Sequence, residues 1–259
     1  MNIRKRGGDY MGIELKYIGW SSFIFTDNKG FKMMTDPFLC GNKDFKILPS
    51  PIAPQAVKTD LIICSHCSSD HFAQAFEIMD ANPNSKLLGD LATLAIAERA
   101  GYGNYLDGRT ELITAGAAYA KSDFIVHATS ARHIAFQTLE NGTFITGEPL
   151  CYIIEIKGGP TCFFGGDTSL TYDMKLWGDL YKPEIAILGI GGADLNGRSL
   201  RELSPKDAAI CAKMLGVKKA IPMHYRLKSD VEEFRRSMVE IYPDCQIIEM
   251  REKDILELS

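Results

Sequence analysis

Short apolar stretches separated by turn residues dominate the first part of the chain. The stretches at 13–19, 21–26 and 31–35 have the length of strands, and Gly19 and the turn sequence DNKG lie between them. This pattern predicts an antiparallel β meander. A strand at 60–64 follows, and beyond it the apolar positions change to helical spacing. These positions are Phe72, Ala75, Phe76 and Met79.

The remaining predicted elements alternate between strands and helices. Helix 204–216 has the clearest end signals, because Ser204 can act as its N-cap, Pro205 fits its first turn and Gly216 can end it. The other predicted segments are strands at 86–88, 182–192, 218–225 and 245–249, two strands within 111–128, a hairpin over 149–168, and helices at 91–101, 170–181 and 230–241. The strand at 245–249 is expected to be the final one.

No linker, charge block or low-complexity tract interrupts this pattern. We therefore expect a single domain over residues 12–259, with the polar and basic residues 1–11 as a flexible lead. Two β-rich halves with helices outside predict an α+β fold, a four-layer αββα sandwich. With 259 residues, of which 46% are apolar, the chain can bury a large core.

The charge of the chain argues against a polyanionic partner. The formal net charge is −4, so nothing favours binding to nucleic acid or to an anionic membrane. No apolar run approaches the roughly 20 residues that a bilayer crossing needs, and the first residues lack the apolar segment of a signal peptide. We expect a cytoplasmic protein without a membrane segment.

The seven cysteines are an odd number at irregular spacing, and several lie inside strand-like runs. Most are expected to be reduced, buried thiols. Cys64 and Cys67 form a CxxC pair, but no second pair exists to complete a structural zinc site, and Cys64 ends a strand pattern. Neither redox nor zinc chemistry is expected of them.

The residues that can carry chemistry gather where predicted strands end. Because strand ends bring ligand-binding loops together in α/β sheets, we expect these residues at one edge of the fold. Imidazoles and carboxylates together suit zinc, iron or manganese, so the cluster predicts a metal site. The fifth histidine, His127, lies within a strand pattern and is expected to be structural. The six predicted site residues are His66, Asp70, His71, His133, Asp167 and His224.

The same residues carry a family resemblance. The segments YIGWSSFIF, TDPFL, SHCSSDH, ARH, GGDT, MKLWGDLYKPEIAILGIGG and IPMHY occur in this order over about residues 13–226. This series resembles the metallo-β-lactamase superfamily, in particular its compact branch of metal-dependent hydrolases, which includes ascorbate-6-phosphate lactonase-like proteins. The resemblance implies one or two divalent metal ions, with zinc expected first and manganese or iron as alternatives. By position, it assigns His66 and His133 to a first metal, Asp70, His71 and His224 to a second, and Asp167 to both.

Two positions depart from the family pattern. The middle histidine of the HxHxDH signature is Ser68 in this chain, and a neutral hydroxyl is a much poorer ligand than an imidazole. We therefore expect a weakened first site and a better occupied second site. Trp20 stands where related sequences commonly have a histidine.

The cluster and the resemblance together predict a hydrolase. A bound divalent cation lowers the pKa of its water from about 15.7 towards about 7, so the water can attack a small ester, lactone or phosphoester. Asp70 and His224 are expected to take part in catalysis, with Asp70 able to return a proton to the leaving group. No GxSxG motif surrounds Ser68 or Ser69, which argues against a serine hydrolase. Ser69 is instead expected to be the N-cap of the next helix.

Other functions remain open at this stage. A non-catalytic or sensory relative would keep a metal-binding scaffold with a weakened first site. Nucleic-acid processing is disfavoured by the acidic charge balance, and di-iron oxygen chemistry normally needs a carboxylate at the position of Ser68 and a flavin partner. The expected partner is a small-molecule substrate, and a homo-oligomer is left open.

Further residues are expected near the same edge. The GIGG sequence at 189–192 is expected to form a close-approach loop that lines the site, because the spacing GxGxxG of a nucleotide-binding loop is not met. Some arginines could bind a phosphate or carboxylate group, or be ordinary surface charges. These are Arg132, Arg198, Arg201 and Arg226.

Overall fold

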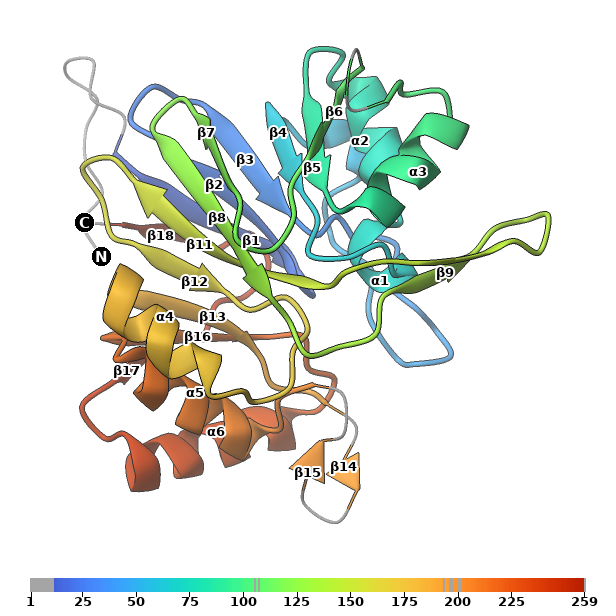
Figure 1. The fold of residues 1–259 in the computed structure, drawn as a ribbon. Coiled ribbons are helices and arrows are strands. Elements are labelled where there is room, and N and C mark those ends of the chain that lie inside the picture. The colour runs from blue at the N-terminus through green and yellow to red at the C-terminus, as the bar shows by residue number, and fades with distance from the viewer. Residues whose placement is uncertain are drawn as a thin grey trace.

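The structure is a computed structural model that describes residues 12–104, 106, 108–192, 194–195, 198–199 and 202–258. The lead predicted at residues 1–11 and the side chains of Arg198 and Arg201 lie outside the described part. Two seven-stranded sheets form the centre of the fold (Figure 1).

The first sheet combines an antiparallel and a parallel part. Its order is β18-β1-β2-β3-β4-β5-β6; the pairs from β18 to β3 are antiparallel, and those from β3 to β6 are parallel. The predicted meander is therefore present as β1 to β3. The bounds are β1 Glu14–Gly19, β2 Ser22–Thr26, β3 Lys32–Thr35, β4 Leu61–Ile63, β5 Lys86–Gly89, β6 Thr110–Leu112 and β18 Ile255–Glu257.

The second sheet has the order β17-β16-β13-β12-β11-β8-β7. Strands β12, β13, β16 and β17 run parallel, whereas β11 is antiparallel to both β12 and β8. Parallel strands place their carboxyl ends at one edge, which is where β12, β13 and β16 lead into the loops of the site described below. The bounds are β7 Ala118–Lys121, β8 Phe124–Ser130, β11 Leu150–Ile156, β12 Cys162–Phe164, β13 Ile185–Gly189, β16 Lys219–Met223 and β17 Gln246–Ile247.

Helices cover the outer face of each sheet and complete four layers (Figure 1). The largest apolar core lies between the sheets and contains residues such as Phe23, Leu150 and Ile187, none of them exposed. One further core packs the first three helices on the first sheet, and another packs the last three on the second. The predicted αββα sandwich is confirmed. The bounds are α1 Ser69–Phe72, α2 Ala75–Ala81, α3 Leu91–Arg99, α4 Asp173–Tyr181, α5 Pro205–Leu215 and α6 Lys228–Ile241.

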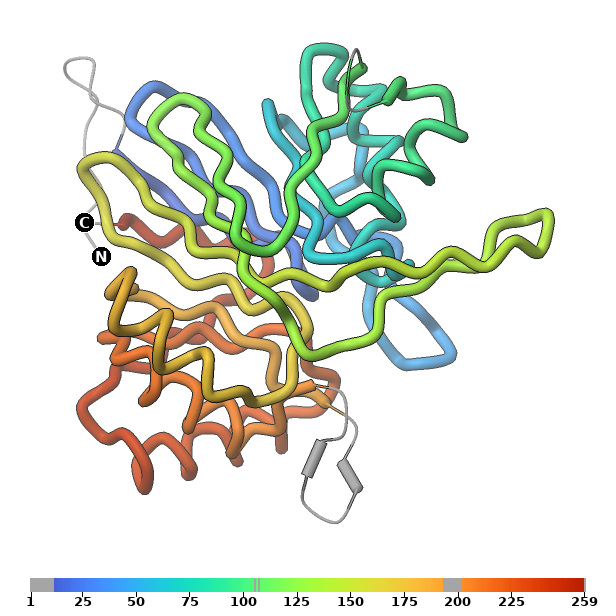
Figure 2. The backbone as a smooth tube through the Cα atoms, viewed as in Figure 1, coloured from blue at the N-terminus to red at the C-terminus, as the bar shows by residue number. Residues whose placement is uncertain are grey.

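A two-stranded hairpin leaves the body of the fold as a long arm (Figure 2). It consists of β9 (Phe136–Thr138) and β10 (Phe144–Thr146). A second small pair, β14 (Asp194–Leu195) and β15 (Arg198–Ser199), precedes α5, and a 3-10 turn covers Pro54–Ala56. None of the described helices has both the length and the apolar composition needed to cross a membrane.

Three sequence-based element predictions need correction. The helix predicted after the strand at 60–64 is split into α1 and α2, because the backbone N–H of Gln74 donates to Pro37 O (3.0 Å) instead of continuing the helix. The segment 111–128 lies in three strands instead of two, because the chain crosses from the first sheet to the second around Gly116, where φ is +89°. The strand near 245–249 is not the last one, since β18 follows and pairs with β1.

Other local predictions agree with the structure. Ser204 is the N-cap of α5 and accepts a hydrogen bond from Asp207 N, Pro205 opens the helix, and Gly216 ends it with φ +72°. Six of the seven cysteines are buried free thiols, and Cys40 is exposed. Burial raises the pKa of the Cys67 thiol to about 12, so the CxxC pair is held in its neutral, unreactive form.

Candidate metal centre

The segment between β4 and α1 provides three of the predicted site residues. His66 follows three residues after the end of β4, and Asp70 and His71 lie in the single turn of α1. The N-cap of this turn is Ser68, with extended backbone and no side-chain cap bond, so the assignment of Ser69 as N-cap is wrong. The short turn brings Asp70 and His71 back towards His66, whose ring centroid lies 4.3 Å from that of His71.

Three other strand ends of the second sheet provide the remaining site residues. Asp167 follows β12 through Gly166, whose φ is +51° and where a Cβ atom would lie 2.6 Å from the Cβ of Ser65. A side chain at position 166 would therefore push the two strand ends apart. His133 follows β8, and His224 is the first residue after β16.

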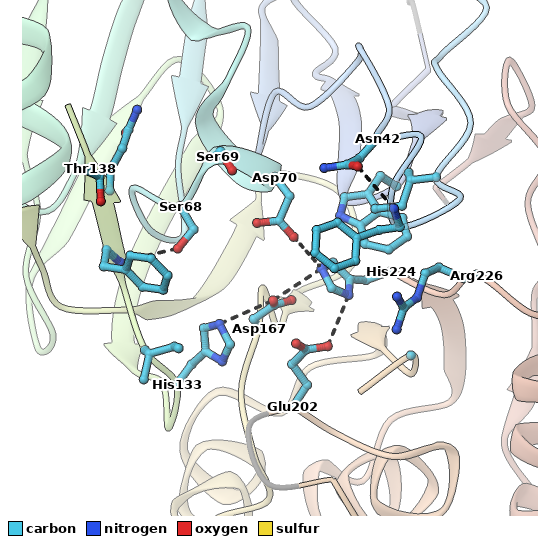
Figure 3. A pocket seen from close by; sticks show the side chains of 17 residues that line it. Asn42, Ser68, Ser69, Asp70, His133, Thr138, Asp167, Glu202, His224 and Arg226 are labelled. Atoms are coloured by element: carbon cyan, nitrogen blue, oxygen red, sulfur yellow. Dashed lines mark hydrogen bonds and ion pairs between the residues drawn. The ribbon is translucent and has the colours of Figure 1, made fainter. Parts of the chain in front are cut away.

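The predicted site residues converge around Asp167, and Figure 3 shows three of them, Asp70, His133 and His224, beside it. Asp167 Oδ2 lies 3.2 Å from His71 Nε2, 3.3 Å from His224 Nε2 and 3.6 Å from His133 Nε2. Asp70 Oδ2 lies 3.3 Å from His224 Nε2. The ligand atoms form two groups, each within 4.8 Å, that share Asp167: His66, His133 and Asp167, and Asp70, His71, Asp167 and His224.

A buried carboxylate that sequence analysis missed, Asp36, contacts the imidazole of His71. Asp36 Oδ2 lies 2.8 Å from His71 Nδ1 and accepts a hydrogen bond from Ser65 Oγ (2.7 Å), while its Oδ1 accepts one from Ser65 N (2.6 Å). Asp36 and His71 are both fully buried. A carboxylate at Nδ1 keeps the proton there, which leaves Nε2 of His71 free as a ligand atom. The segment TDPFL contained the signal, because its aspartate directly follows a buried strand.

Electrostatics in the cluster favour a positive charge. Burial would lower the pKa of His224, but the carboxylates of Asp167, Asp70 and Glu202 outweigh it and raise this pKa to about 10. His71 follows the same pattern, since the nearby aspartates raise its pKa well above the usual value against the effect of burial. Burial would raise the pKa of Asp167, but the surrounding imidazoles hold it well below its usual value. The carboxylates thus stay charged, and a cation would take the place of the protons on the imidazoles.

The residues present fit a metal ion. Buried polar atoms normally have hydrogen-bond partners. Among the buried side-chain atoms without one in the described part of the chain are His66 Nε2, His71 Nε2 and Asp167 Oδ1. All three belong to the two ligand groups, and imidazole nitrogen with carboxylate oxygen is a common ligand set for zinc and for other transition metals.

Trp20 and His224 hold each other in strained backbone conformations. Their φ angles are +53° and +52°. This left-handed backbone conformation costs a non-glycine residue about 1 to 3 kcal/mol of conformational energy. Their rings lie 4.1 Å apart, and the backbone N–H of His224 points to Trp20 O at 3.4 Å. Glu202 Oε2 lies 3.4 Å from His224 Nδ1. Trp20 and Glu202 thus fix the orientation of His224, and sequence analysis missed this role for both.

Ser68 contacts the hairpin arm. Its hydroxyl accepts a long hydrogen bond from Phe136 N (3.5 Å) at the start of β9. The two groups of ligand atoms consist of histidines and aspartates, three in the first and four in the second, so an imidazole in place of Ser68 would add a donor of the same kind.

A cavity of about 460 Å³ opens above the cluster. Gly191 lines it and approaches so closely that a Cβ atom there would lie 2.3 Å from His224 O, as expected of a close-approach loop. Arg226 also lines the cavity. Arg132 is not among the lining residues, and His127 lies outside the cluster, where its Nε2 is 3.0 Å from Glu155 Oε1.

Comparison with known proteins gives consistent matches. The family model described as "Beta-lactamase superfamily domain" matches residues 32–225. The UPF0173 metal-dependent hydrolase of Thermococcus kodakarensis is 30% identical over 234 residues, covering 86% of this chain and 91% of the relative. That of Rubrobacter xylanophilus is 28% identical over 249 residues, with coverages of 93% and 94%.

Solved structures share the fold. A metallo hydrolase from Ignicoccus hospitalis has a TM-score of 0.73 at 21% identity, covering 95% of this chain and 98% of that one. The metallo-β-lactamase fold protein YhfI from Bacillus subtilis has a TM-score of 0.68 at 15% identity, with coverages of 94% and 98%. With its sheets, its cluster at the strand ends and these matches in agreement, the chain belongs to the metallo-β-lactamase superfamily, among its metal-dependent hydrolases.

Proposed function

We propose that this protein hydrolyses a small ester, lactone or phosphoester in the cavity above the cluster, with zinc as the first candidate metal and manganese or iron as alternatives. The observation that carries the proposal is the pair of ligand groups that share Asp167, with all ligand atoms of each group within 4.8 Å. The names of the curated relatives state no substrate, so the choice among ester, lactone and phosphoester rests on the assay described below.

In this proposal, the metal-holding residues are those of the two groups. His66 and His133 would hold a first ion, Asp70, His71 and His224 a second, and Asp167 both. A bound divalent ion supplies a water of lowered pKa and polarises the substrate oxygen. Asp36 keeps Nε2 of His71 free, and Glu202 faces Nδ1 of His224, so both act as positioning residues for ligands.

Asp70 is the proposed proton carrier. Both Asp70 and Asp167 line the cavity, but the Asp70 side chain is 37% exposed and that of Asp167 only 3%, so Asp70 is the more accessible of the two carboxylates. From there it can pass a proton to a leaving group. In the structure as it stands, burial would raise the pKa of Asp70, but His71 and His224 hold it well below its usual value. Asp70 can therefore take up a proton during a reaction only if the positive charge of His71 and His224 beside it decreases.

The experiment measures metal content and hydrolysis in one preparation. Protein purified without chelators is analysed by elemental mass spectrometry and then assayed with nitrophenyl esters, lactones and phosphodiesters, with zinc or manganese added. We expect at least one tightly bound ion and turnover of one substrate class. Asp70→Asn and His224→Ala should abolish turnover, whereas His127→Ala, in the one histidine outside the cluster, should not.

The result also separates the proposal from a non-catalytic scaffold. One tight ion without turnover of any substrate class would contradict hydrolysis and favour the scaffold. Absence of bound metal after reconstitution, in protein that is folded by circular dichroism, would contradict the metal centre itself.

A further inference from the structure

The cavity above the cluster has two chemically different sides. Apolar side chains of the arm and of the loop after β3 reach its mouth, and Ile134, Phe136 and Phe45 remain 45%, 42% and 58% exposed. Polar residues lie at the floor and along another part of the wall. A volume of about 460 Å³ is in the range of sites for small organic molecules, which are mostly apolar with a few polar groups that fix orientation.

Arg226 is the one lysine or arginine among the described residues that line this cavity. It lies two residues after His224, at the end of the segment that leaves β16. No hydrogen bond or ion pair of its guanidinium is found in the described part of the chain, although most charged side chains near the cluster are paired. An unpaired guanidinium beside a cavity presents a fork of donors that fits a carboxylate or phosphate.

Asn42 adds a second set of donors. Its Oδ1 accepts hydrogen bonds from Asp44 N (3.0 Å) and Phe45 N (3.2 Å), which fixes the orientation of the amide. The amide nitrogen has no partner among the described residues, and Asn42 lines the cavity. In Figure 3, Asn42 and Arg226 both lie towards the side of the view opposite to Ser68 and Thr138.

The acidic residues of the cavity do not neutralise these donors. Asp70 and Asp167 lie against the imidazoles of the cluster, where the proposed ions would balance their charge. Glu202 lies against His224 Nδ1 and is 19% exposed. An anionic group at Arg226 and Asn42 would therefore complete the charge balance of the metal-loaded site.

We propose that the substrate is amphipathic: it carries a carboxylate or phosphate that binds Arg226 and the amide of Asn42, and an apolar body that packs on Phe45, Ile134 and Phe136. This inference rests on the proposed function, because it names the chemistry of the same substrate. This anionic group of the substrate binds at the cavity wall. It is separate from the bond that is hydrolysed at the metal cluster.

A binding experiment tests this without turnover. The probes are phenylbutyrate and its neutral analogue phenylbutyramide, titrated into zinc-loaded protein. Trp20 lines the cavity and Trp177 is buried in the core, so the Trp177→Phe variant leaves Trp20 as the only tryptophan reporter. Calorimetry on the unmodified chain measures the same affinities if that variant does not fold.

Two substitutions remove the proposed donors. Arg226→Met removes the guanidinium, and Asn42→Asp keeps the acceptor for the two backbone N–H groups while replacing the amide donor with a negative charge. Arg236→Met is the matched control, because Arg236 is an exposed arginine on α6 outside the cavity lining. We expect the unmodified chain to bind phenylbutyrate about tenfold or more tightly than phenylbutyramide, as a charge-assisted hydrogen bond allows. Arg226→Met and Asn42→Asp should lose this preference, and Arg236→Met should keep it.

Each result has a distinct meaning. Equal binding of the two probes by the unmodified chain, or an unchanged preference in Arg226→Met, would overturn the inference; in the second case the carboxylate would be held by the metal. A preference that depends on Arg226, without hydrolysis of any substrate, would leave the inference standing and contradict the proposed reaction.

Discussion

Replacing Asp36 by asparagine tests whether this buried carboxylate fixes the protonation of His71. The carboxylate contacts Ser65 N, Ser65 Oγ and His71 Nδ1 at 2.6, 2.7 and 2.8 Å. An asparagine of the same shape can still accept from Ser65 N with its amide oxygen. Its NH2 group then faces His71 Nδ1, which must act as an acceptor, so the proton of the imidazole moves to Nε2 and blocks the ligand atom.

The magnitude follows from the contacts that are lost. Hydrogen bonds to a charged group are worth about 1.5 to 3 kcal/mol each, and breaking a buried charged pair costs about 3 to 5 kcal/mol. Because Asp36→Asn keeps the contact to Ser65 N but replaces the charged contacts of Oδ2 by weaker neutral ones, we expect the metal-free protein to lose about 2 to 4 kcal/mol in its free energy of unfolding. Loss of a residue that orients a ligand typically lowers metal affinity by about 10- to 100-fold, and we expect this for zinc.

Urea unfolding of metal-free protein and competition for zinc with a chelating dye measure the two effects. Asp90→Asn is the matched control, because Asp90 is a buried carboxylate (2% exposed) that accepts hydrogen bonds from Thr93 N and Glu148 N, away from the cluster. It should lose stability but keep its zinc affinity. Unchanged zinc affinity in Asp36→Asn would refute the role assigned to Asp36, and an equal loss in both variants would show that the effect is not specific to His71.

Three further predictions address other contacts. Ser68→His gives the first ligand group a fourth donor, so the zinc content per chain after dialysis should rise; an unchanged content contradicts the idea that Ser68 weakens that group. Gly191→Ala places a Cβ atom 2.3 Å from His224 O and should cost about 1 to 3 kcal/mol and lower zinc affinity, whereas Gly165→Ala, with contacts of 3.4 Å or more, should do less in the same assays. Burial would raise the pKa of Asp27, but hydrogen bonds donated by the Ser122 hydroxyl and by backbone N–H groups lower it below its usual value. Asp27→Asn should therefore cost about 1 to 3 kcal/mol at pH 7. The difference from the unmodified chain in urea unfolding should start to shrink below about pH 4, where an unfolded aspartate titrates, and be lost as the pH falls through the lower pKa of folded Asp27; a pH-independent difference would contradict this sign.

Local patterns in the chain determined much of the fold. The meander, the ends of α5 and the four layers follow from apolar spacing, capping residues and glycines, because these signals depend on neighbours within a few positions. The six predicted site residues also lie together in the structure, since four follow strand ends that meet at one edge and Asp70 and His71 lie in the helical turn just after one of them. Their function as ligands stays a prediction until metal is measured.

Contacts between distant segments were decided only by the tertiary structure. The helix after β4 is interrupted because Gln74 bonds to the loop after β3, which no periodicity within the helix can reveal. Asp36, Trp20 and Glu202 reach the cluster from separate parts of the chain, and their roles depend on distances of about a hydrogen bond. The local sequence determines which residues follow a given strand end. Only the packing of the two sheets determines which of these side chains are in contact.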